Sequence, residues 1–137
     1  MPDIDIKSDL LMGVMNLIEA ELHSAGSFLT TDDEKWLDIK KKIFNLRRKY
    51  MKDVEKEDVS KLHCFNKHIL SASSRLTECG DKELRNNNKE KAIEYYKDSR
   101  ILLELFIDLN WVDEKPKKTF INRLMGGNGD VSTKSSA

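Results

Sequence analysis

The scarcity of helix-breaking residues constrains this chain more than any other feature of its sequence. Its two prolines are Pro2 and Pro116, and three of its six glycines follow Met125. A proline inside a helix removes a backbone hydrogen bond and clashes with the preceding turn, so a long stretch without proline permits long helices. Apolar residues also recur there at spacings of three and four, which is the period of an amphipathic helix. The sequence therefore predicts an all-α fold.

Four segments carry this amphipathic pattern: 6–25, 32–53, 59–79 and 89–111. Gly26 and Gly80 are placed to end the first and third segments in a left-handed turn. Thr31 and Glu34 have the spacing of a capping box that would begin the second segment. The asparagines at 86–88 offer N-caps for the fourth. We therefore expect four helices joined by short connections.

The third segment shows a regular seam. Its apolar positions step by three, four, three, four and three residues through Leu62, Phe65, Ile69, Ala72, Leu76 and Cys79. Such spacing is typical of helices packed side by side in a bundle. We predict one domain over 1–112, an antiparallel four-helix bundle. A basic amphipathic segment over 113–125 and a disordered, Gly- and Ser-rich tail over 126–137 should follow it.

Charge and cysteine usage narrow the classes of partner and compartment. Lys plus Arg and Asp plus Glu number 24 each, so no overall positive field favours nucleic acid as a partner. The chain opens with acidic residues and has no apolar run near the roughly 18 residues of a membrane span. Cys64 and Cys79 lie on one expected helix, too far apart for a disulfide. These features indicate a cytoplasmic protein with reduced thiols.

Histidines stand beside potential metal ligands in two places. Glu19 and His23 are four residues apart, but on a helical wheel they lie opposite the apolar face and should be in solvent. His63, Cys64 and His68 include two good zinc ligands, yet His63 points away from the other two and no second cluster completes four ligands. We therefore expect no metal and no cofactor.

Motifs for catalysis are absent from the sequence. It has no glycine-rich phosphate loop, no Gly-x-Ser-x-Gly turn and no Cys-x-x-Cys pair. We assign no catalytic residue, and a non-catalytic protein is favoured over an enzyme.

Two charged residues occupy apolar helix faces. Glu21 falls on the core face of the first segment and Arg47 on that of the second, so an antiparallel helix pair would let them meet. His68 and Arg75 lie beside the seam of the third segment. One hypothesis is a polar cleft of Glu21, Arg47, His68 and Arg75 that binds a small anionic ligand or acts on it. The favoured alternative is a structural ion pair that fixes the register of the helices.

The segment after the fourth helix mixes basic and apolar residues. The candidates for partner binding in it are Lys117, Lys118, Phe120, Ile121, Arg123 and Leu124. A short basic helix of this kind docks on a protein or touches a membrane surface, although one basic cluster gives only weak attraction to lipid. A flap folded back on its own bundle, or a linker, is the simpler interpretation.

A family resemblance covers most of the chain, from Asp9 to Trp111. It rests on Leu-Ile-Glu-Ala-Glu-Leu-His at 17–23, Leu-Arg-Arg-Lys-Tyr at 46–50, His-Cys-Phe-Asn-Lys-His-Ile-Leu at 63–70 and Asn-Lys-Glu-Lys-Ala at 88–92. With these segments the chain resembles small helical proteins of archaea. The resemblance implies a helical bundle in a prokaryotic cytosol and carries over no activity and no functional residues.

The leading expectation for function is a non-catalytic interaction or adaptor protein. It would bind another protein or a second copy of itself, and the surplus apolar residues Leu105 and Ile107 motivate self-association. The alternative is the bundle with a polar cleft for a small anion.

Overall fold

The computed structural model describes residues 3–56 and 62–111, and within these ranges the chain is all-α. Its four helices are α1 (Ile4–Thr31), α2 (Lys35–Val54), α3 (His63–Arg85) and α4 (Lys89–Asn110). The expected all-α class and the four expected helices are confirmed. None of the described helices combines the length and the apolar character needed to cross a membrane.

Neither glycine that was expected to end a helix does so. α1 continues past Gly26 to Thr31, and Asp32 closes it in the left-handed conformation, with its N–H donating to the carbonyl of Phe28. A glycine inside a helix costs only about 1 kcal/mol relative to alanine, so a helix with favourable packing on both sides runs through it. α3 likewise continues past Gly80 to Arg85.

The turn before α2 also differs from expectation. Glu34 occupies the N-cap position of α2, but its side chain makes no capping hydrogen bond. The Thr31 hydroxyl instead accepts from the N–H of Asp33, and the Asp33 carboxylate accepts from the N–H of Lys35. The expected cap of α4 is confirmed, because the Asn88 side chain accepts from a backbone N–H in the first turn.

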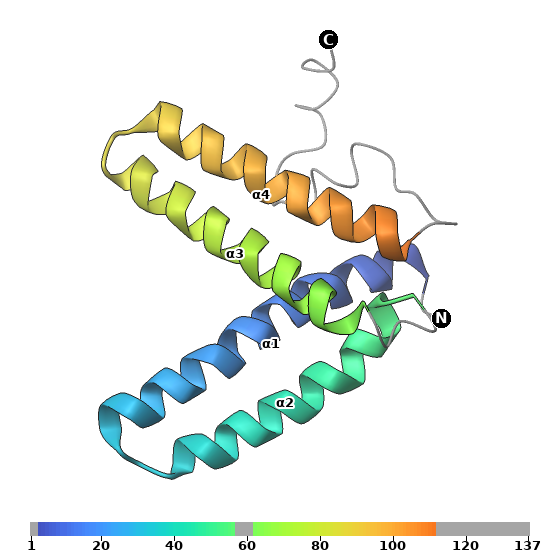
Figure 1. The fold of residues 1–137 in the computed structure, drawn as a ribbon, viewed down its shortest axis with the longest axis vertical. Coiled ribbons are helices and arrows are strands. Elements are labelled where there is room, and N and C mark those ends of the chain that lie inside the picture. The colour runs from blue at the N-terminus through green and yellow to red at the C-terminus, as the bar shows by residue number, and fades with distance from the viewer. Residues whose placement is uncertain (1–2, 57–61, 112–137) are drawn as a thin grey trace.

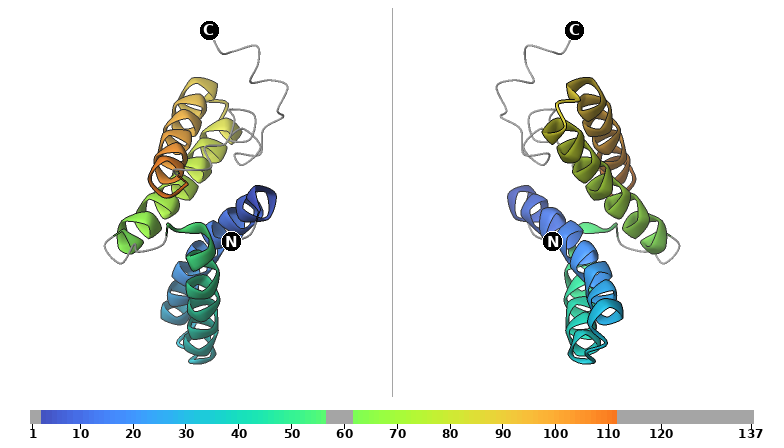
Figure 2. Two further views of the ribbon diagram at one scale, coloured as in Figure 1. Left: turned by 90° about the vertical axis from the view of Figure 1, so that its right-hand side faces the viewer. Right: turned by 90° about the vertical axis from the view of Figure 1, so that its left-hand side faces the viewer.

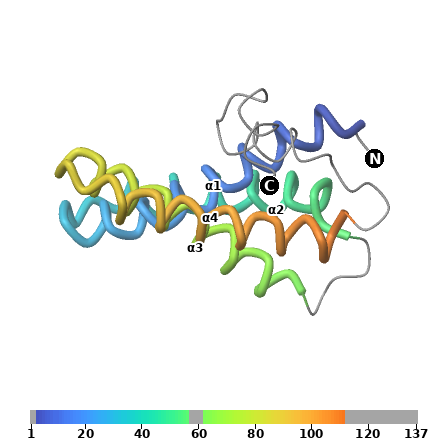
Figure 3. The backbone as a smooth tube through the Cα atoms, turned by 90° about the horizontal axis from the view of Figure 1, so that it is seen from above, coloured from blue at the N-terminus to red at the C-terminus, as the bar shows by residue number. Residues whose placement is uncertain are grey.

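The helices form two hairpins, α1 with α2 and α3 with α4 (Figure 1). Helices within a hairpin run in opposite directions and make most of the helix contacts, and a smaller contact joins α1 to α3. The two hairpins meet at one end and diverge toward their turns (Figure 1), and the side views show them as two separate arms (Figure 2). Viewed from above, both arms extend to the same side of the molecule (Figure 3). Only part of each helix is therefore covered by the other hairpin.

The hydrophobic core lies where the four helices meet. It consists of Leu11, Val14, Ile18, Met51, Val54, Ile69, Leu70, Leu103, Phe106, Ile107 and Trp111. The rings of Phe106 and Trp111 meet edge to face, and the indole N–H of Trp111 donates to the carbonyl of Val54 at 2.9 Å. Ile107, expected on the surface, is only 1% exposed. We call this meeting point of the helices the vertex.

A buried polar network also lies at the vertex. The side-chain amides of Asn66 and Asn110 donate to one another, each at 3.0 Å. The carboxylate of Glu55, just after α2, contacts the amide of Asn66 at 2.9 Å and the ring of His63 at 2.7 Å. The N–H of Lys56 donates to Asn110. This network ties the end of α2 to the start of α3 and the end of α4.

The α3–α4 contact is more polar than its apolar periodicity indicated. Phe65 and Ala72 of the expected seam are exposed, whereas Ser73 is buried and bonds to Ser99 on α4. Thr77 adds a hydroxyl contact to Ser99 at 2.8 Å. Small side chains let two helix backbones approach closely, and hydroxyl hydrogen bonds then replace apolar packing. The expected seam is therefore correct only in part: Ile69 lies in the core, whereas Phe65 and Ala72 do not.

Candidate binding cleft between the hairpins

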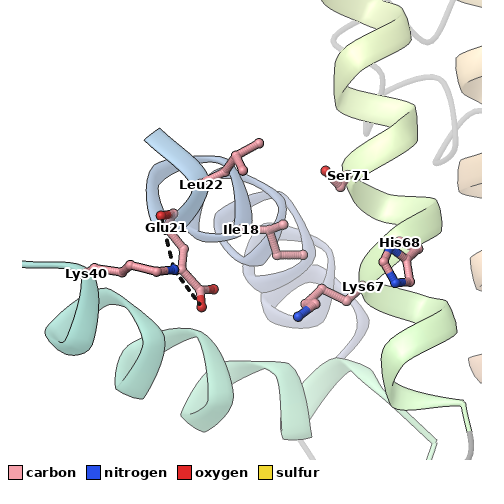
Figure 4. A pocket seen from close by; sticks show the side chains of 7 residues that line it. All are labelled: Ile18, Glu21, Leu22, Lys40, Lys67, His68 and Ser71. Carbon is pink, nitrogen blue, oxygen red and sulfur yellow. Dashed lines mark hydrogen bonds and ion pairs between the residues drawn. The ribbon is translucent and has the colours of Figure 1, made fainter. Parts of the chain in front are cut away.

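A cleft of about 210 Å³ opens beside the vertex, between the two arms. Figure 4 shows its lining: Ile18, Glu21, Leu22, Lys40, Lys67, His68 and Ser71. α1 lies in the middle, α2 brings Lys40 from one side, and α3 brings Lys67 and His68 from the other. The cleft thus exists because the two hairpins diverge from a common vertex.

The ion pair expected from the sequence is present at this cleft. Arg47 Nε donates to Glu21 Oε2 at 2.6 Å, and Arg47 Nη2 donates to Glu21 Oε1 at 3.4 Å. The side chain of Arg47 is 2% exposed and that of Glu21 is 13% exposed. Lys40 Nζ lies 3.7 Å from Glu21 Oε1 and also contacts the backbone carbonyl of Glu21. This pair fixes α1 against α2, as a structural ion pair should.

The surroundings of Glu21 change its titration. Burial alone would raise the pKa of this carboxyl group, but the hydrogen bond and charge of Arg47 act in the opposite direction. Lys40 and Lys67 add smaller attractive effects. The net result is a pKa below the ordinary value of 4.5, so Glu21 is ionised at neutral pH.

Arg47 itself does not line the cleft. It lies behind Glu21, its guanidinium stacks on the ring of Phe44 at 5.0 Å, and its Nη1 atom is buried with no hydrogen-bond partner among the described residues. Arg47 therefore acts on the cleft through Glu21. It is not placed to contact a ligand there.

Arg75 joins α3 to α1 beyond the cleft lining. Its Nε lies 2.6 Å from Glu19 Oε1, and the hydroxyl of Ser71 donates to Glu19 Oε2 at 3.0 Å. The expectation that Glu19 is in solvent is wrong, since its side chain is only 13% exposed. α3 crosses α1 over the face of Glu19, which a wheel of α1 alone does not show. Of the four predicted ligand residues, Glu21 and His68 line the cleft.

Lys40 and Lys67 are the cleft residues that the sequence interpretation missed. Lys40 precedes Arg47 by seven residues, which places both on one helix face, so this signal was available. Lys67 joins the cleft through the angle between the hairpins, for which the sequence carries no signal.

Positive charge is in excess around the cleft. Lys40 and Lys67 line the cleft with one carboxylate, Glu21, and just beyond the lining Arg47 pairs with Glu21 and Arg75 with Glu19. Both carboxylates are largely buried and already paired, whereas Lys40 and Arg75 keep 40% and 49% of their side-chain surface in solvent. A group entering the cleft therefore meets a positive field.

An apolar stripe on α1 runs from the core into the cleft and beyond it. Leu11, Ile18, Leu22 and Leu29 are separated by seven, four and seven residues, so they share one helix face. Leu11 and Ile18 are 0% and 6% exposed, but Leu22 and Leu29 are 58% and 80% exposed. Leu22 belongs to the apolar face of the segment 6–25, which the amphipathic pattern assigns to the core. It is uncovered because the α3–α4 arm has left α1 by this point.

The other candidates from the sequence are the possible metal ligands, the two cysteines and the basic segment. The described residues contain no group of three or more His, Cys, Asp or Glu side chains that would hold a metal ion. Cys64 and Cys79 are free thiols on α3. The expected basic segment 113–125, with its candidate residues Lys117 to Leu124, and the tail 126–137 lie outside the described residues.

No protein-family model, no curated protein and no solved structure matches this chain.

Proposed function

We propose that this chain is a non-catalytic interaction module of the cytoplasm, and that its cleft receives a helix from another protein molecule. The observation that carries this proposal is the α1 stripe. Two leucines of a stripe that is buried nearer the vertex are uncovered: Leu22, 58% exposed, lines the cleft, and Leu29, 80% exposed, lies further along α1. Contiguous exposed apolar surface edged by polar residues is typical of protein interaction sites.

A docked helix would complete the packing that the apolar pattern of α1 predicts. Fully burying a leucine stabilises a complex by roughly 1.5–3 kcal/mol, so Leu22 and Leu29 together supply a useful driving force. With a helix docked between the two arms, the complex would resemble the close-packed antiparallel bundle predicted from the sequence. The partner is either a different protein or a second copy of this chain.

Site-specific photo-crosslinking in the cells that produce the protein tests this proposal. A photoreactive residue at Leu22 or Leu29 should give a discrete crosslinked species, identified by mass spectrometry. The control position is Asn45, which is exposed on α2 outside the cleft lining. A photoreactive residue at Asn45 should not give this crosslinked species. Identical adducts at all three positions, or none at any, would contradict the proposal.

A small anion is a second candidate occupant, favoured by the side chains around the cavity. Lys40, Lys67, His68 and the hydroxyl of Ser71 line a space of about 210 Å³, which suits a carboxylate or phosphate of metabolite size. Phosphate or citrate should then raise the melting temperature more than chloride at equal ionic strength. Lys67→Gln should remove the difference. Equal melting temperatures in all three salts would exclude this function.

A further inference from the structure

Resting on the proposed helix-receiving cleft, we infer that its occupant is an acidic amphipathic helix of a different protein. The inference begins with the shape of the site. Ile18 and Leu22 of α1 form an apolar floor, Lys40 of α2 stands on one side, and Lys67 of α3 stands on the other (Figure 4). A helix lying on this floor would present an apolar face to α1 and a flank to each lysine.

The charged residues around the cleft determine which charge a docked helix should carry on its two flanks. The buried carboxylates of Glu19 and Glu21 already form ion pairs with Arg75 and Arg47, with a distance of 2.6 Å from the arginine Nε to the carboxylate oxygen in each pair. Lys40 lies 3.7 Å from the Glu21 carboxylate and 3.5 Å from its backbone carbonyl, and 40% of its side chain is in solvent. Carboxylates on both flanks of an incoming helix would gain charge-assisted contacts with Lys40 and Lys67. Lysines on those flanks would meet like charge.

The length of the apolar stripe, from the floor at Ile18 to the exposed Leu29, sets the size of the helix. From Ile18 to Leu29 is eleven residues, or roughly 16 Å along α1 at 1.5 Å per residue. A partner segment of three to four turns, with apolar residues at positions i, i+4, i+7 and i+11, covers this stripe. Acidic residues between those positions then fall beside the lysines.

The same charge argument disfavours the two occupants from this chain. Residues 113–125 contain four Lys and Arg against two acidic residues, so this segment has the sign of the cleft itself. A second copy that paired cleft to cleft by two-fold symmetry would bring Lys40 and Lys67 against the same lysines of its partner. An acidic segment from another protein avoids both conflicts.

The test uses the full chain and two designed, fluorescein-labelled peptides of 16 residues. Both carry leucine at the four apolar positions, and they differ only in having glutamate or lysine at the flanking positions. Fluorescence anisotropy should show the acidic peptide binding at least about tenfold tighter at low salt, with the difference shrinking as ionic strength rises.

Two double variants, each with two lysines replaced by glutamine, show which lysines cause the preference for the acidic peptide. Lys40→Gln with Lys67→Gln should lose most of the preference for the acidic peptide. Lys42→Gln with Lys52→Gln removes the same charge from exposed positions of α2 outside the cleft lining and should keep the preference. Equal effects of the two pairs would overturn the inference, because the preference would then follow net charge alone.

The remaining outcomes separate the inference from the proposed function. Equal binding of both peptides, abolished by Leu22→Asp, would overturn the acidic partner and leave the helix-receiving cleft in place. Binding of neither peptide would overturn both. A dimer in sedimentation velocity that excludes the acidic peptide would show that a second copy is the occupant, and would also overturn the inference.

Discussion

Glu21 and Arg47 are the two residues whose contact at the cleft the sequence predicts most directly. A charged side chain on an apolar helix face is unfavourable unless it is paired. Two residues of opposite charge on the apolar faces of neighbouring helices are therefore expected to form an ion pair. Their contact, with Arg47 Nε 2.6 Å from Glu21 Oε2, was predictable from spacing alone. Lys67 was not, because its position beside Glu21 depends on the angle between the hairpins.

The pH dependence of stability should reveal the ionised state of Glu21. Its pKa is lower in the folded chain than the ordinary 4.5, so ionisation stabilises the fold above pH 4.5. This contribution is lost as pH falls through the lower, folded-state pKa. Urea unfolding between about pH 6 and about pH 3 should therefore show wild type losing stability faster than Glu21→Gln. Parallel curves for the two proteins would contradict this role.

Removing Arg47 should be costly, because it leaves the Glu21 carboxylate in a largely buried place. Breaking a buried pair on one side costs roughly 3–5 kcal/mol, and the contact with Lys40 should bring Arg47→Met toward the lower end. Glu21→Leu with Arg47→Met removes both charges and should recover much of the loss. A double-mutant cycle by urea unfolding measures this recovery. Additive losses would show that the two side chains do not stabilise each other.

At the scale of the element, the sequence predicted the presence of the four helices better than it predicted which face of each helix is buried. The existence and type of each helix follow from a period repeated over many residues. The buried face of α3 does not, because Ser73, Thr77 and Gly80 pack against α4 although none is an apolar side chain that periodicity detects. Hydroxyl contacts across a helix pair become visible only when both helices are placed.

Two glycines inside helices offer a matched test of this packing. A Cβ atom at Gly80 would lie 2.5 Å from the Cε1 atom of the Tyr96 ring, whereas a Cβ at Gly26 meets nothing within 4 Å. Gly26→Ala should stabilise the protein by roughly 0.5–1 kcal/mol through helix propensity. Gly80→Ala should destabilise it by roughly 1–3 kcal/mol, since the ring must move and its hydrogen bond to Asp81 is disturbed. Thermal unfolding compares the two, and equal shifts would exclude tight packing at Gly80.

At the scale of the whole molecule, the divergence of the two hairpins creates the cleft. Apolar periodicity predicts a bundle covered along its length, because it assigns the apolar face of the segment 6–25, Leu22 included, to the core. The structure covers Leu11 and Ile18 and leaves Leu22 and Leu29 exposed. What decides this is the vertex, where buried amides and Glu55 hold the ends of three helices in one arrangement. Pairing between side chains so distant in the sequence is not encoded in any local pattern.

The vertex network should therefore set the angle between the arms. Asn110 bonds to Asn66, to the carbonyl of Phe106 and to the N–H of Lys56. Asn110→Leu leaves these buried groups unpaired, at roughly 1–3 kcal/mol for each group that finds no new partner. Because the contact with Lys56 joins α4 to the end of α2, and Asn66 links Asn110 to Glu55, the arms should move more freely relative to each other.

Pulsed electron spin resonance measures this freedom directly. Spin labels at Lys35 and Lys89, near the two hairpin turns, report the distance between the arms once Cys64 and Cys79 are replaced by serine. Asn110→Leu should broaden the distance distribution, whereas Asn45→Leu on the exposed face of α2 should leave it unchanged. If Asn110→Leu lowers stability without broadening, the apolar core alone fixes the angle. Broadening accompanied by weaker peptide binding would connect the vertex network to the shape of the cleft.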